Sequence, residues 1–89
     1  MEITDIKIRK LLDNSKMRAI VSVTFDDTLV VHDIKVIAGS DKLFLAMPSR
    51  QLANGTFADI THPTSSTLRR ELEERVIAEY HRAEAEGNT

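Results

Sequence analysis

The spacing of the apolar residues changes near Pro63, and this change constrains the fold more than any other feature of the sequence. Before Pro63 apolar residues recur at every second position, as Ile6 and Ile8 do, which is typical of strands with one buried face. After Pro63 they recur every three to four positions, which indicates an amphipathic helix. Strands followed by one helix predict an α+β domain built on a twisted antiparallel sheet.

Five strands and one helix are expected. The segment at 29–37 is almost continuously apolar, which favours a central place in the sheet. The helix carries its apolar stripe at Leu68, Leu72, Val76 and Tyr80. The sequence thus predicts one domain over 1–84, with strands at about 3–12, 17–25, 29–37, 43–52 and 56–61, a helix at about 65–84, and a disordered tail at 85–89.

Asn54-Gly55 predicts a β-hairpin, because these residues favour the left-handed conformation that a tight two-residue turn requires. With a two-residue turn, Arg50 faces Asp59 across the hairpin. Arg50 would then be a structural ion-pair partner. If it turned toward the start of the helix instead, it would form half of a phosphate site.

Composition limits the classes of function. The 89 residues carry a net charge of −2, with an acidic excess in residues 71–89 and a slight basic excess before them. No cysteine is present, which excludes a disulfide framework and thiolate metal sites. No apolar run approaches the length of a membrane span, and the alternating N-terminus does not resemble a signal peptide. We expect a soluble cytoplasmic protein.

Catalytic chemistry finds little support. His32 and Asp33 would suit a metal site or acid-base catalysis, but adjacent strand residues point to opposite faces of a sheet. The other histidines, His62 and His81, lie on a loop and a late helical turn. We therefore expect no enzyme activity, no cofactor, no metal and no small-molecule substrate.

Arg69 and Arg70 stand in the first turns of the predicted helix, where the helix dipole disfavours cations by about 0.3 to 1 kcal/mol. In one interpretation they pair with Glu73 and Glu74 on a solvated face. In the other, they combine with free helix amides and the hydroxyls of Thr64, Ser65 and Ser66, which can also cap the helix, to bind phosphate.

A second basic cluster contains Lys7, Arg9, Lys10 and Arg18, expected on the outer side of the first two strands. Such clusters often only solvate a sheet and protect its edge. Aromatic platforms for single-stranded bases are scarce, since Phe25, Phe44 and Phe57 are expected in the core and Tyr80 on the helix stripe. Contacts to the phosphates of a duplex fit the sequence better.

The chain resembles the stage V sporulation protein G (SpoVG) family, the septation regulators of bacteria, over about residues 1–82. Six segments match in order and spacing: "MEITDIKIRK", "MRAIVSVTFDD", "VVHDIKVI", "LFLAMPSR", "GTFADITHP" and "EYHR". The resemblance implies a small dimeric regulator that binds DNA or RNA and affects septation and sporulation. Family members typically carry two basic residues after "MPS", whereas this chain has Arg50 followed by Gln51. "HPTSSTLRR" matches the hydroxyl-rich start of the family's helix, with a basic residue at Arg69.

We therefore expect a cytoplasmic homodimer that binds nucleic acid, with duplex DNA the first expectation and RNA the second, and no membrane. The expected binding residues are Arg50, Arg69, Arg70, Ser65 and Ser66. The alternative is a protein-protein interaction module that acts on the division or transcription machinery without nucleic acid, which the acidic tail favours.

Overall fold

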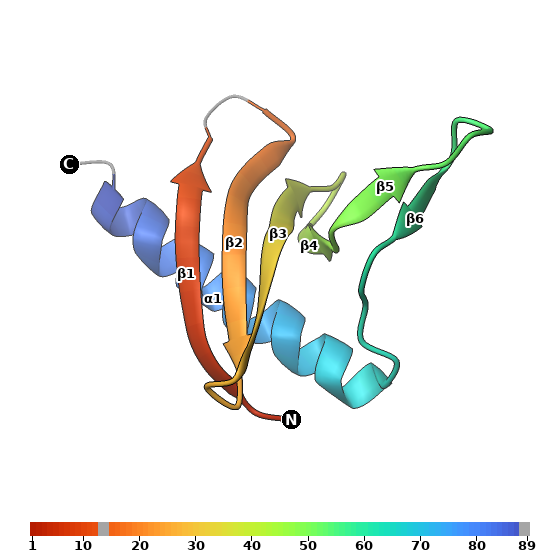
Figure 1. Ribbon diagram of the computed structural model, residues 1–89. Coiled ribbons are helices and arrows are strands. Elements are labelled where there is room, and N and C mark those ends of the chain that lie inside the picture. Colours follow the sequence, from red (N-terminus) through yellow and green to blue (C-terminus); the bar gives the residue numbers. More distant parts are fainter. Residues whose placement is uncertain (13–14, 88–89) are drawn as a thin grey trace.

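A four-stranded antiparallel sheet with one helix packed across it forms the body of the protein (Figure 1). The computed structural model describes residues 1–12 and 15–87. The main sheet has the order β1-β2-β3-β4, and a second, two-stranded sheet pairs β5 with β6. The elements are β1 (Ile3–Leu11), β2 (Met17–Phe25), β3 (Leu29–Ala38), β4 (Leu43–Ala46), β5 (Ser49–Gln51), β6 (Phe57–Asp59) and α1 (Ser66–Gly87).

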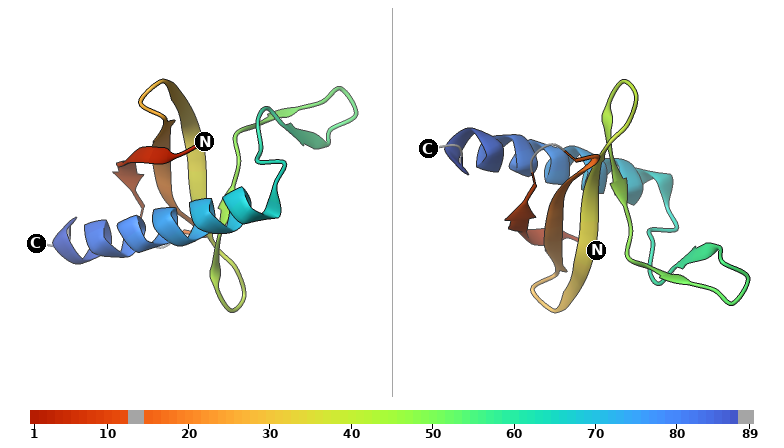
Figure 2. Two further views of the ribbon diagram at one scale, coloured as in Figure 1. Left: turned by 90° about the horizontal axis from the view of Figure 1, so that it is seen from below. Right: turned by 90° about the horizontal axis from the view of Figure 1, so that it is seen from above.

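Helix α1 covers one face of the main sheet, and the core lies between them (Figure 2). The predicted stripe is the buried face of the helix, since Leu72, Val76 and Tyr80 are at most 4% exposed and Leu68 packs beside them. The third strand occupies an inner place in the sheet, as its apolar run predicted. The core residues are Ile3, Ala19, Val21, Val23, Phe25, Ile34, Val36, Leu45, Leu72, Val76 and Tyr80.

Both ends of the helix differ slightly from the predicted range. Ser65 caps the N-terminus, because its Oγ accepts the N–H of Leu68 at 2.9 Å. At the other end the helix continues through residues 85–87, which the sequence had suggested were part of a disordered tail. Residues 88–89, the rest of that predicted tail, lie outside the described residues.

The predicted fourth strand at 43–52 is wrong as one element, because the chain leaves the main sheet at Met47-Pro48. Proline has no N–H to donate to a strand ladder, so β4 ends before it and β5 begins after it. Pro48 is itself buried, and its carbonyl accepts the N–H of Ile60 at 2.7 Å. The β5–β6 hairpin is therefore an arm beside the main sheet, as both views of Figure 2 show.

The register of this hairpin differs by one residue from the prediction. Arg50 pairs with Ala58, and Ser49 takes the place opposite Asp59. The turn has three residues, because the N–H of Leu52 donates to the carbonyl of Thr56 at 2.7 Å. Within this turn only Gly55 is left-handed (φ 89°), whereas the expected two-residue turn needs Asn54 left-handed as well.

A β-bulge interrupts the pairing of β2 with β3. Val21 pairs with Ile34 and Val23 pairs with Val31, so that His32 and Asp33 together lie opposite Ser22. Asp33 adopts φ 63°, a left-handed conformation that aspartate tolerates better than most residues. Strict alternation of side chains therefore fails at His32-Asp33, where the sequence had assigned the two side chains to opposite faces.

Candidate nucleic-acid interface

Arg50 projects from the middle of β5, all three residues of which are exposed. The observed register places Ala58 opposite it, so the predicted ion pair with Asp59 is not formed. Within residues 1–12 and 15–87, no hydrogen bond or ion pair involves the Arg50 side chain. The structure thus leaves this guanidinium open to solvent.

Arg69 and Arg70 lie in the first two turns of α1, and both are exposed. Neither of the predicted ion pairs to Glu73 and Glu74 is formed, since every ion pair among the described residues joins other partners. No acidic residue occupies the first turn of the helix either. Two cations therefore stand near the positive end of the helix dipole with no ion-pair partner in the described part of the chain.

Ser65 and Ser66 differ in what their hydroxyls do. The Ser65 hydroxyl accepts the N–H of Leu68, and its carbonyl accepts the N–H of Arg69 at 3.1 Å. Ser66 is the first residue of α1 and is exposed. Ser65 thus has a structural role as the cap, while Ser66 and the first backbone amides face solvent at the helix start.

The structure groups four of the five predicted binding residues and separates the fifth. Ser65, Ser66, Arg69 and Arg70 share the start of α1, whereas Arg50 lies on β5, at some remove from the helix start in Figure 1. No hydrogen bond or ion pair links Arg50 to the helix within the described part of the chain. The predicted ion pair of Arg50 with Asp59 is therefore wrong, and its role in binding phosphate stays a prediction.

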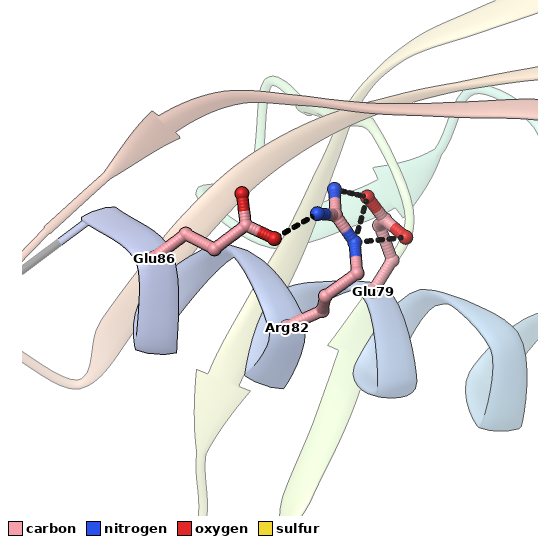
Figure 3. Close-up of polar contacts among 3 residues, drawn as sticks. All are labelled: Glu79, Arg82 and Glu86. Carbon is pink, nitrogen blue, oxygen red and sulfur yellow. Dashed lines mark hydrogen bonds and ion pairs between the residues drawn. The ribbon is translucent and has the colours of Figure 1, made fainter.

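The far half of the helix is electrostatically different, because its arginine is neutralised (Figure 3). Arg82 lies between Glu79 and Glu86, and its Nε donates to both Glu79 oxygens at 3.2 and 3.1 Å. The hydrogen bond from Arg82 lowers the pKa of the Glu79 carboxyl below its ordinary value of 4.5, against a small opposing effect of burial. These charges compensate one another and leave Arg82 a poor phosphate ligand.

Sequence reasoning missed a polar network on the outer side of the main sheet. Ser22 is 4% exposed, and its Oγ accepts the Nε–H of Arg9 at 3.1 Å. The same Oγ lies 2.8 Å from Nδ1 of His32. The signal in the sequence was a lone serine within an apolar strand, but its partners depend on bulges that periodicity does not reveal.

Comparison with known proteins decides the family. The sequence model of the SpoVG family matches residues 1–82. The chain belongs to the SpoVG family. It is 54% identical over 87 residues to a protein of Desulforudis audaxviator named "Putative septation protein SpoVG", covering 97% of this chain and 99% of that relative. Proteins of the same name from Clostridioides difficile (53% over 83 residues, 93% and 90% covered) and Clostridium acetobutylicum (51% over 89 residues, 100% and 94% covered) are also similar.

Exposed apolar side chains occur on and just after β6 and at the start of β3 in this SpoVG chain. Phe57 on β6 is 69% exposed and Ile60 just after it is 65% exposed. Leu29 and Val30, at the start of β3, are about half exposed, and they line one open depression together with Ile60. The expectation that Phe44 and Phe57 belong to the core is therefore wrong, and the Phe57 and Ile60 side chains are available for contact with a partner.

The described residues of this SpoVG protein form neither a metal-binding cluster nor a candidate membrane span. No group of three or more His, Cys, Asp or Glu side chains is arranged to hold a metal ion there. Their one helix is too polar to be a candidate for a membrane span.

Proposed function

We propose that this SpoVG-family protein is a small homodimeric regulator that binds duplex DNA in the cytoplasm and acts, without catalysis, in septation and sporulation. The observation that supports the proposal is the state of its three predicted arginines. Arg50, Arg69 and Arg70 are exposed and make no ion pair among the described residues. Their charges are therefore available to an external anion.

The helix start suits a phosphate for a second reason. The first amides of α1 lack intrahelical partners, and only that of Leu68 is satisfied by the Ser65 cap. Amides at a helix N-terminus, a neighbouring hydroxyl and two guanidinium groups are the donors that bind a phosphate oxygen. In this proposal Arg69 binds phosphate directly, with Arg70 and the Ser66 hydroxyl in support, and Ser65 acts by holding the helix start in place.

Dimerisation would combine weak sites. A chain of 89 residues buries only about 60 to 65% of its unfolded surface, so it would gain stability by self-association. Phe57 and Ile60 supply exposed apolar surface for such a contact. A two-fold dimer would present two copies of Arg50 and of the helix start to one duplex, and the second contact would benefit from a high effective concentration.

The test is a titration of labelled duplex DNA across a salt series, with single-stranded DNA and RNA of the same sequence in parallel. The variant Arg50→Ala/Arg69→Ala should reduce the slope of log affinity against log salt by about 0.9 for each phosphate that is no longer neutralised. Lys42→Ala/Arg82→Ala removes the same charge from a loop and from the neutralised half of the helix, and should keep the wild-type slope. Circular dichroism checks that both variants are folded.

Binding by the wild type that does not depend on salt, or wild-type affinity in Arg50→Ala/Arg69→Ala, would show that these residues are not the binding site. No binding of any nucleic acid at low salt would reject the proposed function. The protein-interaction module would then be the better hypothesis, and partners retained after nuclease treatment would support it.

A further inference from the structure

The face of the main sheet opposite α1, called here the helix-free face, is the face toward the viewer in Figure 1. The alternation of side chains along β2 shows which residues lie on the helix-free face. Ala19, Val21 and Val23 are fully buried under the helix, so Ile20 and Ser22 point to the opposite, helix-free face. Strand pairing then places the neighbours of these residues on the same face. Its cations are Lys7, Arg9 and Lys10 on β1, Arg18 on β2 and Lys35 on β3.

None of these five cations forms an ion pair with a carboxylate among the residues that the structure describes. All ion pairs among the described residues lie on α1, and none includes a cation of the main sheet. One carboxylate shares the helix-free face, since Asp5 pairs with Thr24, and Asp33 stands in the bulge beside it. The net charge of −2 therefore hides a division, with most of the acidic side chains of residues 71–89 on the helix and an excess of cations over carboxylates on the helix-free face.

Arg9, on the edge strand β1, reaches inward over this face and is held there by Ser22 on β2. Its Nε–H donates to the buried Ser22 hydroxyl, which also contacts His32. The two terminal nitrogens of the guanidinium make no hydrogen bond within the described residues, and Arg9 is exposed. An arginine anchored through Nε presents its other N–H groups in a fixed fork, so less side-chain entropy is lost when it binds an anion.

The other cations lie in neighbouring rows of the sheet, at the spacing of the strands. Lys10, Ile20 and Lys35 form one row across β1, β2 and β3, which sets the two lysine backbones about 10 Å apart. Lys7 lies opposite Ser22 in the next row. Cations spread over three strands suit an extended, repeating array of negative charge better than a single carboxylate.

We propose that the helix-free face is a second surface for the phosphate backbone of duplex DNA, separate from Arg50 and the start of α1, with Arg9 positioned by Ser22 as its main ligand. Charge complementarity identifies the occupant, because a duplex presents one negative charge per about 1.7 Å of its axis. The inference rests on the proposed function only in requiring that the protein binds DNA. It assigns a different set of residues.

The experiment compares three variants with the wild type in the same salt titration. Arg9→Gln/Lys35→Gln removes two cations from the helix-free face and should lower the salt slope by about 1.8 for each subunit engaged. Lys42→Gln/Arg82→Gln is the matched control and should keep the slope. Ser22→Ala leaves every charge in place, so it should keep the slope and weaken affinity at each salt concentration.

The outcomes separate the two proposals. If Arg9→Gln/Lys35→Gln binds like the wild type while Arg50→Ala/Arg69→Ala is impaired, the helix-free face is not a binding surface and the proposed function stands. If the wild type binds no duplex, both proposals fail. If native mass spectrometry shows that Arg9→Gln/Lys35→Gln becomes monomeric while the subunit still binds DNA normally, the face holds a second copy of the chain and the proposal is wrong. Wild-type affinity in Ser22→Ala would reject the role of Ser22.

Discussion

Arg50 lies opposite Ala58 across the β5–β6 hairpin, one residue away from the acidic Asp59. The guanidinium consequently has no carboxylate facing it, and its charge contributes nothing to the pairing of the two strands. A side chain in this position is free to serve binding alone, which makes stability and affinity separable at this residue.

For Arg50→Ala we expect a free energy of unfolding within about 0.5 kcal/mol of the wild type, because an exposed side chain without partners is removed. Affinity for duplex DNA should fall in the same variant. Urea unfolding and the salt titration measure the two effects on one preparation. A loss of stability above about 1 kcal/mol would mean that Arg50 has a structural partner after all.

Ser65→Ala should destabilise the protein by about 1 kcal/mol, because it removes the hydroxyl that accepts the N–H of Leu68. Ser66→Ala is the matched control, since Ser66 is an exposed neighbour whose side chain caps nothing. Thermal and urea unfolding of the two variants should therefore differ, with Ser65→Ala the less stable. Equal stabilities would contradict the assignment of Ser65 as the cap.

At Asp33 we expect glycine to be better than alanine. The left-handed conformation (φ 63°) costs a residue with a Cβ about 1 to 2 kcal/mol, which exceeds the entropic cost of glycine, about 0.5 to 1 kcal/mol. Asp33→Gly should thus be more stable than Asp33→Ala. Lys35, two residues away in regular strand, is the control position, where Lys35→Ala should be more stable than Lys35→Gly. If glycine were the more stable residue at both positions, the left-handed conformation of Asp33 would not be the cause.

Phe57→Ser/Ile60→Ser should convert the proposed dimer into a monomer, because these two side chains provide the most exposed apolar surface after Met1. Sedimentation equilibrium over a range of concentrations measures the change. Leu11→Ser, at a side chain 39% exposed on β1, is the control and should leave the mass unchanged. A dimer that survives the double substitution would place the interface elsewhere.

The Glu79–Arg82 interaction should make stability depend on pH in the acidic range. Because the folded pKa of Glu79 lies below its ordinary value of 4.5, the stabilisation is present above that value and is lost as pH falls through the folded pKa. The difference in unfolding free energy between wild type and Glu79→Gln should therefore shrink below pH 4.5. Urea unfolding at a series of pH values tests this, and a difference that grows on acidification would have the wrong sign.

The periodic parts of the fold could be predicted from the sequence because burial alone decides them. Leu72, Val76 and Tyr80 had to share one helix face, and that face is the one packed on the sheet. The strands at 17–25 and 29–37 follow in the same way from alternation and an apolar run. In these segments local preference and tertiary packing favour the same structure.

The hairpin could be predicted only in outline. Asn54-Gly55 occurs in two-residue and in three-residue turns, and the choice shifts every partner on the two strands. The Asn54 side chain stabilises the three-residue turn here, since its Oδ1 accepts both the N–H and the hydroxyl of Thr56. Pro48, which has no N–H, was a sequence signal for the end of a strand. The predicted strand nevertheless ran through it, from 43 to 52.

The candidate site was predictable as a set of residue types and not as an arrangement. The sequence identifies Arg50 and Arg69 as candidate binding residues. It does not show whether an exposed charge forms an ion pair, because this depends on strand register and rotamer, and an exposed ion pair contributes too little free energy to impose a recognisable sequence pattern. The Arg9–Ser22 contact was hidden for a related reason, because a bulge at residue 9 brings the two together.

The separation of the β5–β6 arm from the main sheet affects how the protein can diversify. The two strands pair with each other and with no strand of the main sheet, so a change of length or sequence near Gly55 leaves the pairing of the core untouched. Variants of this arm can accumulate at little cost to folding. The same body can thereby carry arms fitted to different ligands.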